Sequence, residues 1–208
     1  MDQQATEQPT DGRIRRGDQT RRVVLGRAVD VASVDGLDGL SIGRLAGELD
    51  ISKSGLIGHF GSKEELQLAT IRAARAIFAS TVIAPALALP PGKERLRTLL
   101  EGWLAYSSDR RFPGGCFFAR ASHEYAARPG PIRDALAAVD AEWVRLITQT
   151  AADAQAAGEI QADVDPAQLA FDLTAFLDAA NLRSLLGDSD VYERAHRSMR
   201  DRLAAVSS

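Results

Sequence analysis

The chain contains a single cysteine, Cys116, among its 208 residues, so an internal disulfide is excluded. Its three histidines, His59, His123 and His196, are far apart in the sequence and show no spacing that would hold a metal ion. No apolar stretch reaches the roughly 18 uninterrupted residues that a membrane span needs, and the polar, arginine-rich N-terminus is unlike a signal sequence. We therefore expect a cytoplasmic protein that has no metal, no cofactor and no contact with a membrane.

Positive charge is also scarce overall. The net charge of −3 at pH 7, taken alone, argues against a nucleic-acid partner. The distribution is uneven, however, because one short segment with a single acidic residue, Asp18, contains Arg13, Arg15, Arg16, Arg21, Arg22 and Arg27. Arginines in such a run are often only solvated, so this basic segment indicates DNA binding only if a DNA-binding fold accompanies it.

Helical periodicity dominates the chain after its first residues. Residues 1–16 are polar and have no apolar period, which predicts a disordered basic arm. Beyond them, apolar residues recur at helical spacing, no segment alternates as a strand does, and no internal repeat is present. With 45% apolar residues the chain can bury a substantial core. We predict an all-α protein of about nine helices.

Serines in suitable positions mark the starts of three helices near the N-terminus. A first helix ends in the turn-forming pairs Asp35-Gly36 and Asp38-Gly39. Ser41, Ser52 and Ser62 then stand where the N-caps of a second, third and fourth helix are needed. Three short helices followed by a longer one predict a helix-turn-helix domain over residues 17–62, with the fourth helix leading into the next domain.

Residues 63–208 are predicted to form a second helical domain. The Pro- and Ala-rich segment 84–92 forms a joint after the fourth helix, which is expected to reach Val82, and further helices follow up to about residue 205. The helix from Pro166 to Leu186 is apolar on two sides, with Leu173 and Phe171 on different faces. One face can pack in its own core while the other packs against a second subunit, which favours a homodimer.

An ordered series of residues in the first domain resembles the TetR/AcrR (tetracycline-repressor-like) family of regulators. The series runs through Leu40-Ser41-Ile42, Leu45-Ala46, Leu49, residues 51–56, His59-Phe60 and residues 62–66. The resemblance implies a dimer that binds a palindromic double-stranded DNA operator and is released when an unidentified small-molecule effector binds the C-terminal domain. The alternative is a helix-turn-helix protein that organises DNA, or an activator, without a small-molecule effector.

The resemblance also implies which residues contact DNA. Lys53, Ser54 and Gly55 begin the recognition helix, whose N-terminal residues reach base edges in the major groove. Lys53 can donate to guanine or, alternatively, to a phosphate. The matching positions that grip phosphates are those of Ser41, His59 and Lys63.

Two further positions of the DNA-binding domain are less clear-cut. Arg44, on the outward side of the second helix, is either a further DNA contact or a solvated surface arginine. Ile57 departs from the family, which usually has an aromatic residue three positions before Phe60. DNA binding is then expected to depend more on the arginine arm, or on an apolar contact between Ile57 and a thymine methyl.

Candidate effector contacts follow from large or polar side chains on the apolar helices of the second domain. Most large apolar side chains there, Phe118 and Phe171 included, are expected to be ordinary core. Asp178 lies on an otherwise apolar helix, and a buried carboxylate needs a partner, which is either a ligand or an arginine such as Arg120. The predicted ligand-binding residues are Trp103, Tyr106, Cys116, Phe117, His123, Glu124, Trp143, Phe176 and Asn181.

Cys116 allows two interpretations. At the start of a helix it is placed to sense electrophiles or oxidants as a thiolate, or else it is a small buried hydrophobe. Cys116 and His123 could also be drawn as a nucleophile and base, yet no third orienting group is evident. We therefore expect a regulator and not an enzyme.

Overall fold

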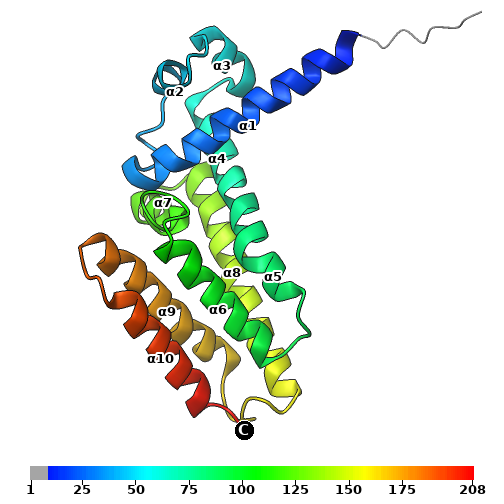
Figure 1. The fold of residues 1–208 in the computed structure, drawn as a ribbon, viewed down its shortest axis with the longest axis vertical. Helices are drawn as coiled ribbons and strands as arrows, with labels where there is room; N and C mark the ends of the chain where they lie inside the picture. The colour runs from blue at the N-terminus through cyan, green and yellow to red at the C-terminus, as the bar shows by residue number, and fades with distance from the viewer. Residues whose placement is uncertain (1–8) are drawn as a thin grey trace, which may run out of the picture.

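The computed structural model describes residues 9–208, with side chains described from residue 17 onward. The helices α1 (Pro9–Asp35), α2 (Ile42–Leu49) and α3 (Lys53–Phe60) form a head at one end of an elongated body (Figure 1). The described residues contain no named strand, only an isolated bridge between Ile160 and Ser207. The all-α prediction is thus confirmed for this part of the chain.

The three serine N-caps are confirmed by their hydrogen bonds. The hydroxyl of Ser41 accepts from the backbone N–H of Arg44, and that of Ser52 accepts from Gly55, each at 3.1 Å. Ser62 accepts in the same way from Glu65 at the start of α4 (Lys63–Phe78). Each bond satisfies one of the backbone donors that a helix start leaves unpaired, which is why these helices begin where they do.

The fourth helix is longer than predicted. After α4 the chain makes a π-helical segment, η1 (Ala79–Ile83), and continues as α5 (Ala84–Leu87). Pro85 has no N–H and its ring clashes with a preceding carbonyl in a regular α-helix, so the wider π turn just before it allows the helix to continue. The joint therefore begins after Leu87 and not at residue 84.

The continuous rod of 25 residues, Lys63–Leu87, is long and apolar enough to cross a membrane by length and composition alone. The core helix of a soluble protein meets the same test, and this rod packs against α1, α6 and α8. Its apolar residues are explained by that packing: Leu66, Ala74 and Val82 are buried in the shared core.

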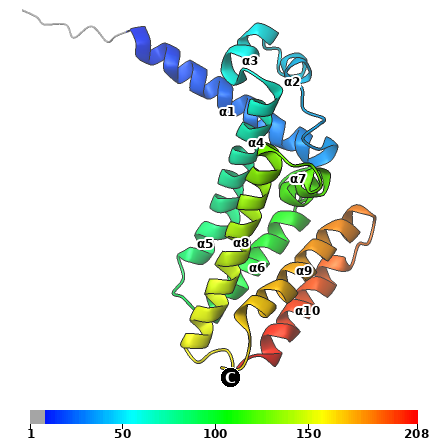
Figure 2. The same ribbon diagram turned by 180° about the vertical axis from the view of Figure 1, so that it is seen from behind.

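The body consists of this rod and five further helices. They are α6 (Lys93–Ser108), α7 (Phe117–Tyr125), α8 (Pro131–Ala156), α9 (Pro166–Leu185) and α10 (Val191–Ala205). With the rod counted once, the described residues form nine helices, as predicted. Seen from either side, α9 and α10 lie together along one edge of the body, away from α5, while α7 lies directly beneath the head (Figures 1 and 2).

Phe78, the last residue of α4, lies at the centre of an aromatic cluster in the body. Its ring makes edge-on contacts with Tyr106 of α6 and Trp143 of α8, both at 5.3 Å between centroids, and with Phe118 of α7 at 6.0 Å. Edge-to-face pairs of this kind add about 0.5–1.5 kcal/mol each beyond the area they bury. The helix that starts in the head is thereby fixed to three helices of the body.

The predicted disordered arm, residues 1–16, differs in part from the structure. The helix α1 begins at Pro9, so residues 9–16 are helical, while residues 1–8 lie outside the described residues. In a helical extension of α1, the backbone N–H and C=O groups of these polar residues can form hydrogen bonds with one another, and this does not require an apolar face.

Two tyrosines of the body are predicted to respond oppositely to loss of their hydroxyl. Tyr106 is buried, and its hydroxyl has no hydrogen-bond partner among the described residues, whereas the Tyr125 hydroxyl donates to Asp38 and accepts from Gln67. Tyr106→Phe should leave the free energy of unfolding unchanged or raise it by about 1 kcal/mol, while Tyr125→Phe should lower it by about 1–2 kcal/mol. Urea denaturation of both variants checks this, and a larger loss for Tyr106→Phe would contradict it.

Candidate DNA-binding surface and effector cavity

The helix α3 presents one face to solvent and one to the head. Leu56 and Phe60 are buried, and with Leu45 and Ala46 of α2 they form the small core of the head. On the other face Lys53, Ser54, Gly55 and Ile57 are exposed, Ile57 to 44%. An exposed isoleucine beside a lysine and a serine on a short, capped helix is a surface that can lie against base edges in a major groove.

The predicted phosphate contacts flank this helix. Ser41 is exposed at the N-terminus of α2, and its hydroxyl proton remains available while its oxygen caps the helix. Lys63 is exposed at the start of α4, where its Nζ donates to the carbonyl of Asp38 at 2.8 Å. His59 is half-buried in the last turn of α3, close to Gly17 of α1. Both helix starts also favour anions through their free amides.

Arg44 is not free in the structure. Its guanidinium forms ion pairs with Asp35 at 2.6 Å and with Glu48 at 2.9 Å, and Glu48 also holds Arg27 at 2.6 Å. The hydrogen bonds from Arg44 and Arg27 lower the pKa of Glu48, so this carboxylate stays charged. A contact between Arg44 and DNA therefore requires that these ion pairs be exchanged for a phosphate.

Arg21 has a role that the sequence did not reveal. From α1 its Nη1 donates to the carbonyl of His59 at 2.5 Å, and its guanidinium lies 4.6 Å from the ring centroid of Phe60. The guanidinium thus gives a carbonyl in the last turn of α3 a hydrogen-bond donor, and it packs on the ring of Phe60, which is buried in the head. Arg21 therefore positions the recognition helix. From the sequence, it was predicted only to be one of the arginines of the basic segment.

The turn between α1 and α2 is held by side chains from the body. Asp38 of this turn accepts from the Tyr125 hydroxyl at 2.7 Å and from Arg128 at 2.5 Å. These two bonds lower the pKa of Asp38, while burial and the bond to Asp38 raise the pKa of Tyr125 to about 12. From α4, Gln67 donates to the carbonyl of Leu37 at 2.9 Å.

Glu124, predicted as an effector contact, binds the same turn instead. Its carboxylate accepts from the backbone N–H groups of Leu37 at 2.7 Å and Asp38 at 3.0 Å. Gly36 has a φ of +78°, and a Cβ there would lie only 2.2 Å from the Glu124 carboxylate, so glycine is required for this approach. We call Glu124, Tyr125 and Asp38 the junction cluster, since they join α7 to the head.

A cavity of about 170 Å³ lies in the body directly below the junction cluster, between α4, α6, α7, α8 and α9. Its aromatic lining comes from Phe78, Trp103, Phe118 and Trp143. Its polar lining includes Ser122 and His123 of α7, Asp140 of α8, and Thr174 and Asp178 of α9. A concave, mostly apolar site with a few converging polar groups is the usual form of a small-molecule site.

Four of the nine predicted effector contacts line this cavity: Trp103, Cys116, His123 and Trp143. Tyr106 and Phe117 are buried in the aromatic packing, and Phe176 of α9 packs against the core without lining the cavity. Asn181 has a structural role, because its Oδ1 accepts from the backbone N–H of Cys116 and from the Ser107 hydroxyl.

Sequence reasoning missed Asp140, whereas Asp178 was already a polar candidate whose expected partner was a ligand or an arginine. Asp178 is the polar residue on an apolar helix that pointed to this site, whereas Asp140 lies on an exposed helical face and only the packing of α8 against α9 brings it here.

The structure favours one of the two interpretations of Cys116. The side chain is buried, and burial raises the pKa of its thiol to about 11, although the nearby backbone amides of Ala119 and Phe118 act in the opposite direction. At neutral pH the group is therefore a protonated thiol, which is a weak nucleophile. Cys116 behaves as a small apolar residue in the cavity wall.

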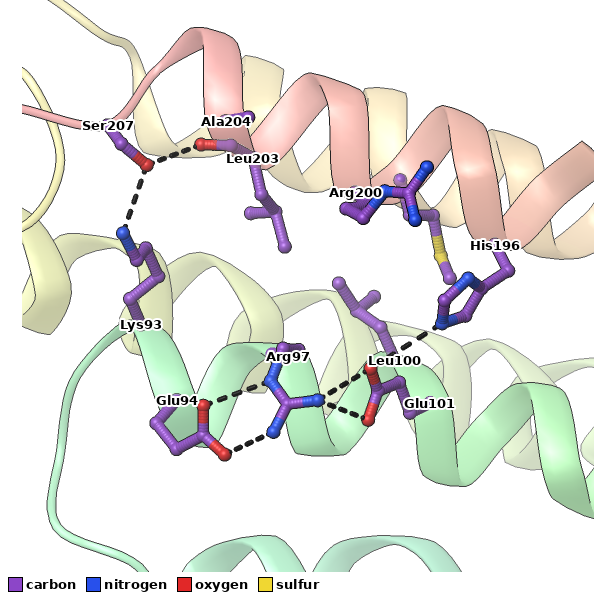
Figure 3. A pocket seen from close by; sticks show the side chains of 11 residues that line it. Lys93, Glu94, Arg97, Leu100, Glu101, His196, Arg200, Leu203, Ala204 and Ser207 are labelled. Carbon is purple, nitrogen blue, oxygen red and sulfur yellow. Dashed lines mark hydrogen bonds and ion pairs between the residues drawn. The ribbon is translucent and has the colours of Figure 1, made fainter.

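A second, larger cavity of about 410 Å³ lies between α6 and α10 (Figure 3). Its charged side chains are largely paired with one another: Arg97 binds both Glu94 and Glu101, and Lys93 donates to the Ser207 hydroxyl. Neither cavity offers a metal site, because no three His, Cys, Asp or Glu side chains in the described part of the chain come together to hold an ion.

Comparisons with known proteins agree with this architecture. The family model described as bacterial regulatory proteins, tetR family, matches residues 24–70, and the tetracyclin repressor-like C-terminal domain matches residues 92–199. No curated protein matches the chain.

Several solved structures share the fold over nearly the whole chain. A TetR transcriptional regulator from Chloroflexus aurantiacus is 26% identical, with 93% of this chain and 98% of that chain covered at a TM-score of 0.84. A transcriptional regulator from Saccharomonospora viridis, in complex with choline, is 23% identical, with 92% and 99% covered at 0.79. AibR, in complex with isovaleryl coenzyme A and operator DNA, is 20% identical, with 89% and 97% covered at 0.71.

The head thus coincides with the DNA-binding match and the cavity with the ligand-domain match. Both family matches and the shared fold indicate a transcription factor. The exposed α3, its serine-capped neighbours and the matches over both domains together identify the chain as a member of the TetR family of DNA-binding transcriptional regulators.

Proposed function

We propose that the protein is a cytoplasmic repressor that binds a palindromic operator as a homodimer and is released when a small molecule occupies the cavity lined by Trp103 and Trp143. The observation that carries the proposal is that α7 contributes both to the wall of this cavity and to the junction cluster that holds the head. Ser122 and His123 line the cavity, and the next two residues, Glu124 and Tyr125, bind the turn between α1 and α2.

Solved structures of the same fold support operator binding and small-molecule binding as separate parts of the proposal. AibR was crystallised with a coenzyme A thioester and operator DNA together, and the regulator from Saccharomonospora viridis with choline. Such complexes are consistent with a DNA-bound and a ligand-bound state for this chain. A ligand can weaken DNA binding only to the extent that it binds one conformation of the protein more tightly than the other.

An exposed apolar stripe on α9 supports a homodimer. Phe171 is 67% exposed, Leu182 51% and Leu186 79%, and with the exposed Ala175 and Ala179 they follow a spacing of three and four residues along one face. Phe171 is thus a surface residue on the second apolar face that the sequence predicted for this helix. In a monomer, this face of α9 would leave an apolar patch exposed to water. A second copy of the chain would cover the patch if the two subunits packed as a four-helix bundle.

Removing the positive charge of Lys63 or of Lys53 should distinguish a contact that positions the protein on the DNA backbone from a contact that recognises the base sequence. We expect Lys63→Gln to weaken binding to every duplex alike and to reduce the slope of log K against log salt by about one unit. Lys53→Ala, on the exposed face of α3, should instead change the relative affinities for different sequences. Binding of both variants to duplexes selected from a random library measures this; loss of specific and non-specific affinity in the same ratio for both would refute the division.

The dimer prediction concerns the stripe on α9. Leu182→Glu should give a monomer in sedimentation and weaken operator binding by about 100-fold or more, because the two half-sites are then no longer bound together. Leu87→Glu is the matched control, since Leu87 is similarly exposed but lies on α5 at the opposite edge of the body. A dimeric Leu182→Glu variant with full affinity would disprove the proposed interface.

The junction cluster should determine how firmly the head is held. Glu124→Ala removes the acceptor for the amides of Leu37 and Asp38, so their hydrogen exchange should accelerate about tenfold or more, and operator affinity should change with it. The control Glu193→Ala lies on α10 and makes no bond to the head. Unchanged exchange at Leu37 and Asp38 in Glu124→Ala would mean that α7 does not hold this turn.

A further inference from the structure

The cavity below the junction cluster carries unmatched negative charge. Asp140 and Asp178 line it from α8 and α9, and within the described residues neither carboxylate has an ion-pair or hydrogen-bond partner. No lysine or arginine is among the lining residues. The other cavity differs in this respect, because Arg97 there is bound by two glutamates.

The surroundings of Asp178 are unfavourable for a lone carboxylate. Desolvation by the cavity wall, and then the negative charge of Asp140, raise the pKa of Asp178, while His123 offsets this in part. Asp140, His123 and Asp178 are all exposed, so they lie at the open end of the cavity. A positive charge bound between the two carboxylates would relieve this repulsion.

Aromatic rings form the inner part of the same cavity. Phe78, Trp103, Phe118 and Trp143 line it, and Phe78 meets Trp143 edge-on. The face of an aromatic ring attracts a cation, tryptophan most strongly, and the attraction grows as water is excluded. Carboxylates at the mouth and rings behind them therefore complement a cation that has an apolar group attached.

Two other ligand types fit less well. A metal ion lacks the three close ligands it would need. An anion would meet the two carboxylates, with His123 and the hydroxyls of Ser122 and Thr174 as the side-chain donors. At the N-terminus of α7 the sulfur of Cys116 already lies beside the amides of Phe118 and Ala119, and the amide of Cys116 binds Asn181. At about 170 Å³ the cavity is also smaller than the 300–1,000 Å³ typical of drug-sized ligands.

We infer that the effector of this regulator is a small organic cation, a quaternary ammonium ion or protonated amine with an apolar substituent, whose charge lies between Asp140 and Asp178 and whose apolar part lies against Trp103 and Trp143. The inference rests on the proposed function, in that it names the ligand class for the cavity assigned there. Binding of the charged nitrogen at the mouth places the apolar group next to Phe78, the end of the helix that begins at Lys63.

The two tryptophans of the chain both line this cavity, so intrinsic fluorescence reports on its occupancy. The full chain is titrated separately with benzyltrimethylammonium, benzyl alcohol and benzoate. Each compound has a phenyl ring, and they carry a cation, a neutral group and an anion, respectively. At 0.15 M NaCl the cation should bind at least tenfold more tightly than the other two, a difference of about 1.4 kcal/mol. Equal affinities, or preference for benzoate, would overturn the inference.

Variants then assign the preference to the two carboxylates. The double variant Asp140→Asn/Asp178→Asn should lose about tenfold or more in affinity for benzyltrimethylammonium and change little toward benzyl alcohol. Asp134→Asn is the matched control, since it removes the same charge from α8 without touching the cavity. Thermal melts check folding, and the single variant Asp140→Asn, on an exposed residue, should show an intermediate loss if the double variant is unstable. An unchanged preference for the cation in Asp140→Asn would reject the site.

Operator binding with and without benzyltrimethylammonium separates this inference from the proposed function. If the cation binds the cavity but leaves operator affinity unchanged, release by ligand fails while the ligand class stands. If benzyl alcohol or benzoate releases the operator and the cation does not, the ligand class fails while the proposed function stands.

Discussion

The position of the head on the body depends on one turn, residues 36–39, whose backbone is bound by side chains of the body. Glu124 binds its amides, Gln67 binds the carbonyl of Leu37, and Tyr125 binds the Asp38 side chain. Because buried or half-buried backbone groups must find partners, this turn cannot move without leaving several of them unpaired. The helices α2 and α3 follow directly, so their orientation is set by the same contacts.

The rod from α4 to α5 supplies the other connection between head and body. It starts beside the turn, where Lys63 reaches Asp38, and Phe78 contacts three body helices through its aromatic ring. Two routes, one through α7 and one through α4, therefore run between the cavity and the head. Both consist of packed side chains and hydrogen bonds between rigid helices, which is the kind of element that can couple two sites.

Local features were predictable from the sequence because they depend on residues close together in the chain. The caps at Ser41, Ser52 and Ser62 and the bounds of α9 follow from short-range spacing, and the structure agrees with them. The roles of Arg21 and Glu124 were not predictable, since their partners are 38 and 87 residues away. Of the cavity lining, Trp103, Cys116, His123 and Trp143 were predicted from the sequence, whereas Asp140, on an exposed face of α8, gave no signal until α9 was placed beside it.

The ion pairs of Arg27 and Arg44 with Glu48 affect the electrostatic attraction between this DNA-binding protein and distant DNA. Paired charges produce a weaker field beyond the Debye length of about 10 Å, so these two arginines contribute little to long-range attraction toward DNA. The attraction that remains comes from basic side chains that are not paired with a carboxylate, so the total number of arginines overstates the attraction toward DNA.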